Sequence, residues 1–266
     1  MTSLVRHSTW FLTRDGGPAS GVQIFCFPYG GGSPRVYLDW QPVLGDDAQI
    51  VAVCPPGRDH RVDERAPSSI AELADGAAAA IRAYADRPTV LFGHSLGALV
   101  AFEVARRVSG SAAFVHLVAS GCAAPSLIPS DYIRWAAQLS GQDFADAAGR
   151  YEGLSPEVVA DPELQELLLP DLRADLRLVA EYRYRPAAPL PVGVSLVNGR
   201  DDWHITEAAL EPWRRECQAA PRYHWTDGGH FYFDGRPSTV VEVLRSVVRE
   251  PSAGAAVAAA EHVEVI

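Results

Sequence analysis

The sequence contains no lysine: all 23 of its basic residues are arginine. Arginine codons are GC-rich and lysine codons AT-rich, so this absence indicates a GC-rich coding genome rather than a special binding site. Acidic residues number 33, which gives a formal net charge of −10. Nucleic acids and anionic membranes both bind basic surfaces, so neither is expected as a partner.

Cysteine is scarce, and long apolar runs are missing. The cysteines are Cys26, Cys54, Cys122 and Cys217, and their spacing is that of neither a metal site nor a disulfide framework. No stretch approaches the roughly 20 apolar residues that span a bilayer. The N-terminus lacks the apolar segment of a signal peptide. We therefore expect reduced, buried cysteines and a cytoplasmic protein.

Ligand-binding signatures are absent as well. No set of His, Cys and carboxylate residues has metal-ligand spacing, and neither a phosphate-binding loop nor a dinucleotide fingerprint is present. The expected chemistry uses no metal and no cofactor. A length of 266 residues suits one large α/β domain or two small ones. We expect one domain over 1–266.

Short apolar runs alternate with helical patterns along most of the chain. Near-continuous apolar runs are typical of strands buried on both faces of a parallel sheet. The strand candidates are 22–28, 48–55, 89–93, 114–121, 192–199 and the more polar 222–229. The helical segments between and after them are 68–85, 96–108, 206–217 and 238–250. Ser69 and Glu72 have the spacing of a capping box at the start of the first helix. This alternation predicts a doubly wound α/β fold.

One interval, 123–186, contains no strand candidate. It holds helical pieces at 131–139 and 162–185, and its place between two strands predicts a helical lid inserted over the edge of the sheet. An ordinary crossover with extra helices is the alternative. The Ala-rich tail, 251–266, has no amphipathic register and is expected to be mobile.

A candidate nucleophile, Ser95, stands in Gly93-His94-Ser95-Leu96-Gly97, between a predicted strand and a predicted helix. A serine in such a strand–turn–helix elbow is exposed to substrate, and its flanking glycines leave room for the sharp turn. The helix that follows offers the Leu96 N–H to an oxyanion. A second N–H is expected from Gly30 or Tyr29, in the glycine-rich loop after the strand 22–28.

A serine nucleophile needs a base and an acid that orients the base. His230 follows the last strand candidate, and Asp201 and Asp202 follow the strand 192–199. This is the chain order Ser, Asp, His of the elbow hydrolases, and all three positions lie at the carboxyl edge of the sheet. One of the two aspartates is expected to be the acid, and the other the N-cap of the next helix.

These residues together resemble the type II thioesterases, the stand-alone α/β-hydrolases of polyketide synthase and nonribosomal peptide synthetase pathways. The resemblance covers nearly the whole chain in order. It rests on FCFPYGGGSPRVYLDW at 25–40, PPGRDHRVDE at 55–64, GHSLGALVAFEVA at 93–105, SGCAAP at 120–125, LRADLRLVAEYRY at 172–184, NGRDD at 198–202 and GGHFYF at 228–233. In the family the acid stands three residues after the glycine of the NGRDD segment, which selects Asp202. Gly30 replaces the usual alanine of the first segment.

The resemblance implies hydrolysis of aberrant or stalled acyl groups from the phosphopantetheine arm of acyl or peptidyl carrier proteins, without a cofactor. Trp203 replaces a frequent proline and Cys122 a frequently basic residue, and both are candidates to shape the acyl pocket. Carrier proteins are usually acidic, so a chain with a charge of −10 needs a local basic patch to bind one. The candidates for it are Arg58, Arg61 and Arg65, or Arg183 and Arg185 at the end of the lid.

Three other functions fit parts of the pattern. A cytosolic esterase would act on free small esters with the same triad. A product-releasing thioesterase would discharge a finished chain, but such domains are usually fused to a synthase, whereas this chain begins and ends around one hydrolase. A non-catalytic scaffold would bind carriers only, and the intact Ser95, Asp202 and His230 argue against it.

Overall fold

The central feature of the protein is one mixed, mostly parallel β-sheet. The computed structural model describes residues 4–15, 17–18, 21–151, 154 and 156–250. Within these residues the strand order is β1-β2-β4-β3-β5-β6-β7-β8. The bounds are β1 Leu4–Arg6, β2 Phe11–Arg14, β3 Val22–Phe27, β4 Ala48–Val53, β5 Thr89–His94, β6 Phe114–Ser120, β7 Gly193–Gly199 and β8 Arg222–Thr226. The strands β3 to β8 pair in parallel, which confirms the predicted α/β class.

The first two strands were not foreseen from the sequence. β1 pairs with β2, and β2 pairs with β4, in both cases antiparallel. They are three and four residues long, and β1 is mostly exposed. Strands this short are too brief to show the apolar run that marks the others. They extend the sheet at the edge away from the predicted site.

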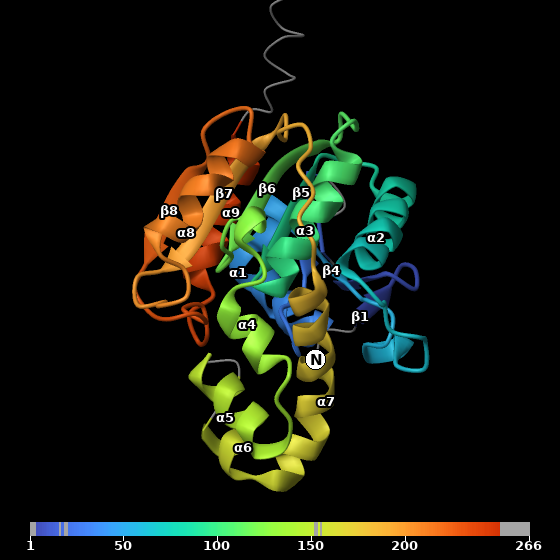
Figure 1. The fold of residues 1–266 in the computed structure, drawn as a ribbon. Coiled ribbons are helices and arrows are strands. Elements are labelled where there is room, and N and C mark those ends of the chain that lie inside the picture. The colour runs from blue at the N-terminus through green and yellow to red at the C-terminus, as the bar shows by residue number, and fades with distance from the viewer. Residues whose placement is uncertain (1–3, 16, 19–20, 152–153, 155, 251–266) are drawn as a thin grey trace, which may run out of the picture.

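Side chains alternate between two cores along each parallel strand, as the pleat of a strand requires. On β3, Phe25 and Phe27 face one core, and Ile24 and Cys26 face the other. Helices α2 (Ile70–Tyr84) and α3 (Leu96–Val108) cover the first core, and α1 (Gln41–Leu44) and α9 (Ser238–Arg249) cover the second (Figure 1). The sheet is therefore buried on both faces, which explains its near-continuous apolar strands.

Between β6 and β7 the chain leaves the sheet and forms a group of helices, which we call the lid. Its members are α4 (Asp131–Ala136), α5 (Gly141–Arg150), α6 (Pro156–Ala160) and α7 (Pro162–Glu181). Figure 1 shows these helices together at one end of the molecule, beyond the body formed by the sheet. The predicted mobile tail, 251–266, lies outside the described residues.

Helix starts follow the capping rules with two differences in detail. The Ser69 side chain accepts from Glu72 N at 3.1 Å, as expected, but the Glu72 carboxylate accepts from Ser68 N rather than from Ser69. The helix α8 (Glu207–Leu210) is capped by Thr206, whose hydroxyl accepts from Ala209 N. The prediction that an aspartate of the NGRDD segment caps this helix is therefore wrong.

The strand order places a topological switch point in the middle of the sheet. From β3 the chain continues to β4 on one side, whereas β5 leads to β6 and β7 on the other. In open α/β sheets, ligands bind at the carboxyl ends of the strands where the order reverses. Here that position lies between the ends of β3 and β5, beside the glycine-rich loop and Ser95. Among the described residues, no helix combines the length and apolarity needed to cross a membrane.

Candidate active site

Ser95 occupies a strained turn between β5 and α3. Its φ of 54° and ψ of −119° lie in a region that non-glycine residues rarely adopt, and such strain is commonly found at functional sites. A Cβ on Gly93 would lie 2.1 Å from Gly97 O, and one on Gly97 would lie 2.2 Å from Phe27 O. Both glycines are thus required because backbone passes directly over them.

Gly97→Ala is expected to destabilise the fold, because the new methyl group would collide with backbone that cannot move aside. Overpacking of this kind costs about 1–3 kcal/mol, or more where the obstacle is rigid. Gly110→Ala is the matched control, since a Cβ there meets nothing within 4 Å, and we expect a change below about 0.5 kcal/mol. Urea unfolding of both variants measures the difference, and equal stabilities would contradict the steric argument.

Two buried side chains, His230 and Asp202, form a hydrogen-bonded pair. His230 Nδ1 lies 2.7 Å from Asp202 Oδ2, and the two residues are 1% and 4% exposed. Asp202 Oδ1 also accepts from His204 N at 2.9 Å. Burial raises the pKa of Asp202, but the hydrogen bond and charge of His230 and the His204 N–H outweigh it, so that the net pKa is lowered. The carboxylate therefore stays ionised beside the imidazole.

Close packing of two loops brings this pair together. Asp202 follows β7 and His230 follows β8, and Asp201 N donates to Gly228 O across the gap at 3.0 Å. A Cβ on Gly199 would lie 2.3 Å or less from the carbonyl oxygens of Gly228 and Gly229. The glycines of the NGRDD and GGHFYF segments thus permit the loops to approach. Asp201 is exposed, whereas Asp202 is buried against His230.

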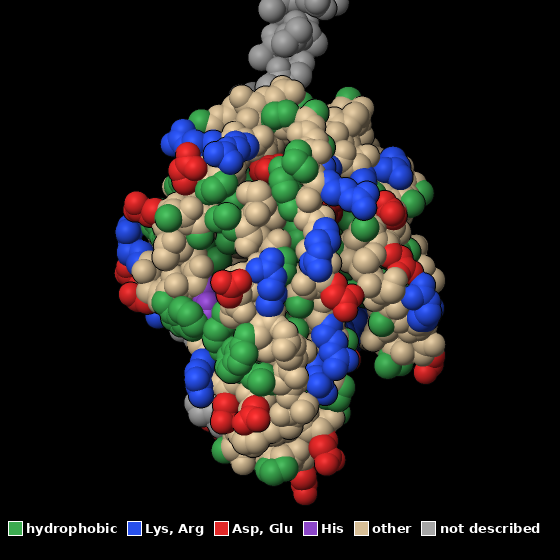
Figure 2. All heavy atoms as spheres, viewed as in Figure 1, with side chains coloured by type: hydrophobic (Ala, Val, Ile, Leu, Met, Phe, Trp, Pro, Cys, Tyr) green, Lys and Arg blue, Asp and Glu red, His purple; other side chains and the backbone are tan. Residues whose placement is uncertain are grey.

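Ser95 and His230 line one cavity of about 310 Å³, together with other residues singled out in the sequence. These are Tyr29, Gly30, Leu96, Cys122 and Trp203. The lid completes the cavity with side chains such as Leu172, Leu176 and Val179 from α7. We call this cavity the acyl chamber. Figure 2 shows hydrophobic side chains gathered beside a histidine where the lid meets the body.

The glycine-rich loop offers backbone donors to this chamber. Within the described part of the chain, the amides of Tyr29 and Gly30 donate no hydrogen bond, whereas Gly32 N donates to Tyr29 O at 2.9 Å. Leu96 is the first residue of α3, so its N–H has no acceptor within the helix. Two sets of unpaired N–H groups thus flank Ser95, as an oxyanion hole requires.

A buried chain of hydrogen bonds through His94, Ser120 and Tyr232 lies next to His230. His94 Nδ1 lies 2.8 Å from Ser120 Oγ, which lies 2.7 Å from Tyr232 OH. The rings of His94 and His230 have centroids 4.7 Å apart. Burial and repulsion by His230 lower the pKa of His94 well below its ordinary value. His94 therefore stays neutral and does not oppose a positive charge on His230.

The lid adds a contact that sequence reasoning missed. Tyr151 packs edge-to-face on His230 with ring centroids 5.0 Å apart, and stacks on His204 at 3.6 Å. Tyr151 also lines the acyl chamber. No spacing signal connects it to the triad, because the lid helices bring it there from a segment without strands. Trp203, at 55% exposure, forms part of the chamber's outer wall.

The first set of candidate carrier contacts, Arg58, Arg61 and Arg65, does not form a basic patch. Arg58 pairs with Asp171 and Asp175 of α7 and is largely covered. Arg61 is 7% exposed, pairs with Glu64 and donates to Cys54 O at 2.9 Å. Arg65 is exposed but pairs with Glu72. Each of these charges is matched by a carboxylate, so a docking role for the three as a basic cluster lacks geometric support.

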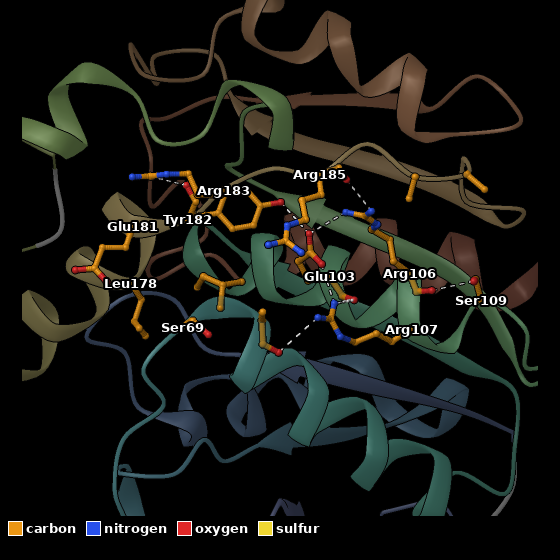
Figure 3. A pocket seen from close by; sticks show the side chains of 14 residues that line it. Ser69, Glu103, Arg106, Arg107, Ser109, Leu178, Glu181, Tyr182, Arg183 and Arg185 are labelled. Carbon is orange, nitrogen blue, oxygen red and sulfur yellow. Dashed lines mark hydrogen bonds and ion pairs between the residues drawn. The ribbon is translucent and has the colours of Figure 1, made fainter.

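Arg183 and Arg185 lie elsewhere, on the rim of a cleft of about 650 Å³ between α2, α3 and the end of α7 (Figure 3). At its centre Glu103 accepts from Arg106, Arg107 and the Tyr182 hydroxyl, at 3.0, 2.7 and 2.8 Å. Among the described residues, no acidic side chain pairs with Arg183 or Arg185. These two keep a charge available to a partner.

The arrangement matches known proteins over most of its length. The thioesterase domain family matches residues 22–248. The curated relative linear gramicidin dehydrogenase LgrE of Brevibacillus parabrevis is 31% identical, covering 92% of this chain and 94% of its own. Among solved structures, the type II thioesterase BorB of the borrelidin cluster superposes with a TM-score of 0.81 at 29% identity, covering 92% of this chain and 100% of BorB.

A second solved structure agrees with this assignment. RedJ, a thioesterase of the prodiginine pathway in Streptomyces coelicolor, is 31% identical with a TM-score of 0.78, and the match covers 86% of each chain. TM-scores of 0.81 and 0.78 over most of each chain show that BorB and RedJ share the fold of this chain. The chain therefore belongs to the thioesterase family and has the α/β-hydrolase fold of the type II thioesterases.

Proposed function

We propose that the protein hydrolyses acyl groups from the phosphopantetheine arm of carrier proteins in a polyketide or nonribosomal peptide pathway, with Ser95, His230 and Asp202 as its catalytic triad. The observation that carries the mechanism is the buried His230–Asp202 pair, at 2.7 Å, beside a chamber that Ser95 also lines. The carrier-bound substrate is supported by the relatives, several of which are named as thioesterases of cadicidin, anguibactin or yersiniabactin biosynthesis.

The first half of the reaction forms an acyl-enzyme. Ser95 Oγ attacks the thioester carbonyl as His230 Nε2 takes its proton. The N–H groups of Leu96 and Gly30 hold the oxyanion, and Asp202 stabilises the imidazolium through Nδ1. When the tetrahedral intermediate collapses, the C–S bond breaks and His230 gives its proton to the departing thiol.

The second half releases the acid. A water molecule loses its proton to His230 as its oxygen attacks the acyl carbon, and the same N–H groups hold the second oxyanion. Collapse breaks the bond to Ser95 Oγ, which takes the proton back from His230. Asp202 remains ionised throughout, as its lowered pKa permits.

The acyl chamber would set which chains are accepted. Its walls are largely apolar and come from both the body and the lid, with Cys122 and Trp203 at the positions where this chain departs from its family. Apolar walls favour alkyl chains, and one methylene in such a pocket is worth about 1–3 kcal/mol of discrimination. Trp203 stands at the exposed side, where it would contact a chain that extends toward solvent.

The proposed partner is an acidic carrier protein, and Arg183 and Arg185 are its candidate contacts. Both are exposed, and among the described residues neither has an acidic partner. Their local charge would offset the net charge of −10, which opposes long-range attraction.

The four cysteines are free and buried, which suits the reducing conditions of the cytoplasm, the expected compartment.

The name of the gramicidin relative suggests redox chemistry, yet this chain lacks the G-x-G-x-x-G sequence that binds a nicotinamide dinucleotide. The glycines at 30–32 follow a strand but continue into a short 3₁₀ segment, Pro34–Trp40, instead of a long helix whose N-terminus could hold a pyrophosphate. The thioester function is the one that the residues around Ser95 support.

The experiment that tests this function compares a panel of acyl groups on a purified carrier protein with the same acyl groups on a free pantetheine thiol. We expect a higher kcat/KM on the carrier, and we expect Arg183→Glu with Arg185→Glu to remove most of that gain while leaving the free thioesters unaffected. Equal kcat/KM on both substrate forms would contradict the carrier role and favour a small-ester hydrolase.

A further inference from the structure

The glycine-rich loop is held by the lid, not only by the sheet that precedes it. Gly31 N donates to Asp175 Oδ2 on α7 at 2.8 Å. A Cβ on Gly31 would lie 3.1 Å from Leu172 Cβ, and one on Gly30 would lie 3.6 Å from Leu172 Cδ1. Leu172 and Asp175 are three residues apart and so share one helical face. This face of α7 rests directly on Gly30 and Gly31.

Arg58, in the loop after β4, forms an ion pair with the same Asp175 carboxylate. Its Nη2 lies 2.8 Å from Asp175 Oδ2, and its guanidinium also pairs with the Asp171 side chain and donates to Asp171 O at 3.0 Å. The side chains of Arg58 and Asp175 are 14% and 16% exposed, whereas that of Asp171 is 55% exposed. Asp175 is therefore the covered centre of a network that joins the loop after β4, the glycine-rich loop and the lid.

The Asp175 carboxyl group is largely withdrawn from water, since its side chain is only 16% exposed. Burial raises the pKa of this carboxyl group, and the charge of Arg58 and the Gly31 N–H lower it without fully compensating. A carboxylate in such a place is costly unless its hydrogen bonds are kept. Arg58 and the Gly31 N–H both donate to this carboxylate, so the glycine-rich loop cannot move away from α7 without breaking a charge-assisted hydrogen bond.

We propose that Asp175 is a positioning residue for the oxyanion hole: by holding the Gly31 N–H, it fixes the neighbouring Gly30 N–H toward the oxyanion on the thioester carbon. The proposal rests on the proposed function of Ser95 and Gly30. With the Gly31 amide bound to Asp175 and the Gly32 amide used within the turn, the donors left for the oxyanion are those of Gly30 and Tyr29. Asp175 thereby removes the Gly31 amide from the groups that could face the chamber.

This geometry couples the lid to the chemistry. A lid displaced from its present place would carry Asp175 away and release the Gly31 amide, so the oxyanion hole would lose one fixed donor. Oxyanion donors act because they are oriented before the reaction begins, and a displacement of about 1 Å can cost on the order of 100-fold in rate. The hole is therefore complete when α7 is docked over the loop.

The test uses the full chain, a hexanoyl thioester of N-acetylcysteamine, and an alkyl boronic acid, which adds to a serine hydroxyl as a tetrahedral anion. For Asp175→Ala we expect kcat to fall on the order of 10- to 100-fold, with KM changed by less than about threefold and boronate affinity reduced by a factor similar to that of kcat. Asp175→Asn keeps an acceptor for the Gly31 amide and should recover part of kcat. The matched control, Asp171→Asn, removes a partner of Arg58 without touching Gly31, and should stay within about threefold of wild type.

Two results would overturn the proposal. One is a kcat of Asp175→Ala within threefold of wild type. The other is an equal loss in Asp175→Ala and Asp171→Asn, which would show that the network only anchors the lid. Asp175→Ser, also too short to reach the amide, gives the same comparison if the alanine variant does not fold. If the wild-type protein shows no Ser95-dependent hydrolysis, the proposed function fails together with this inference. If the wild type is active and Asp175→Ala is equally active, this inference alone fails.

Discussion

Ser95→Ala is expected to reduce thioester hydrolysis by about 10⁴- to 10⁶-fold, because no other group at the elbow can form the acyl-enzyme. The substitution removes only Oγ, so the strained turn with its φ of 54° is kept and the fold should be unaffected. Steady-state hydrolysis of an acyl thioester measures the loss. Mass spectrometry after rapid acid quench should detect an acyl adduct on the wild type and none on the variant.

Ser109→Ala is a suitable control for this experiment. Ser109 lies at the opposite end of α3, where its hydroxyl donates to Arg106 O at 3.0 Å. The same chemical change there should leave kcat/KM on a free acyl thioester within about twofold of wild type, since Ser109 is remote from the acyl chamber and such substitutions have small effects. Undiminished hydrolysis by Ser95→Ala would refute the proposed mechanism, and an adduct on another residue would identify a different nucleophile.

Asp202→Asn is the second large effect, with an expected fall in kcat of about 10⁴-fold. An amide at this position has no charge to stabilise the imidazolium, and its NH₂ group can hold His230 with Nδ1 as an acceptor. The other ring nitrogen would then carry the proton, so His230 could not accept one from Ser95. Substrate binding should persist, so KM should change far less than kcat.

Its matched control is Asp201→Asn, one residue away. Asp201 is exposed, whereas the Asp202 carboxylate is buried against His230 Nδ1 at 2.7 Å. The control should retain wild-type kcat/KM within about twofold. The two variants are assayed side by side on one thioester. An equal loss of kcat in Asp201→Asn and Asp202→Asn would contradict the assignment of Asp202 as the acid of the triad.

Much of this site could be anticipated because its parts lie at strand ends. Strands such as 89–94 carry continuous apolar runs, and the residues that follow a parallel strand must emerge at one edge of the sheet. Ser95, Asp202 and His230 each follow a strand of the parallel sheet, although the strand before His230 is more polar than the other two. Their roles as catalytic residues remain predictions, but their neighbourhood follows from strand order alone.

The lid was harder to anticipate because helix periodicity does not say what a helix faces. The apolar side chains of α7 form one broad set in the sequence, yet Leu172 and Leu176 line the acyl chamber while Leu167 is 73% exposed. Asp175 carries no motif that ties it to Gly31, 144 residues away. Charged residues gave the least information, since Arg58 and Arg61 resemble surface arginines until their carboxylate partners are known.

The lid's connection to the body has a consequence for how the specificity of such enzymes could diversify or be engineered. The insertion leaves from β6 and returns to β7, which are neighbouring strands, so a foreign lid could be spliced there without disturbing the sheet. The grafted lid would carry the carboxylates of the donor protein, and these would have to bind Arg58 and the Gly31 N–H of the host. Chimeras are therefore expected to work when the donor segment supplies an acidic residue at the position of Asp175. Recombination at these two points would transfer the lid, and with it the acyl preference, as one unit, provided that the ion pair between Arg58 and the residue at position 175 is kept.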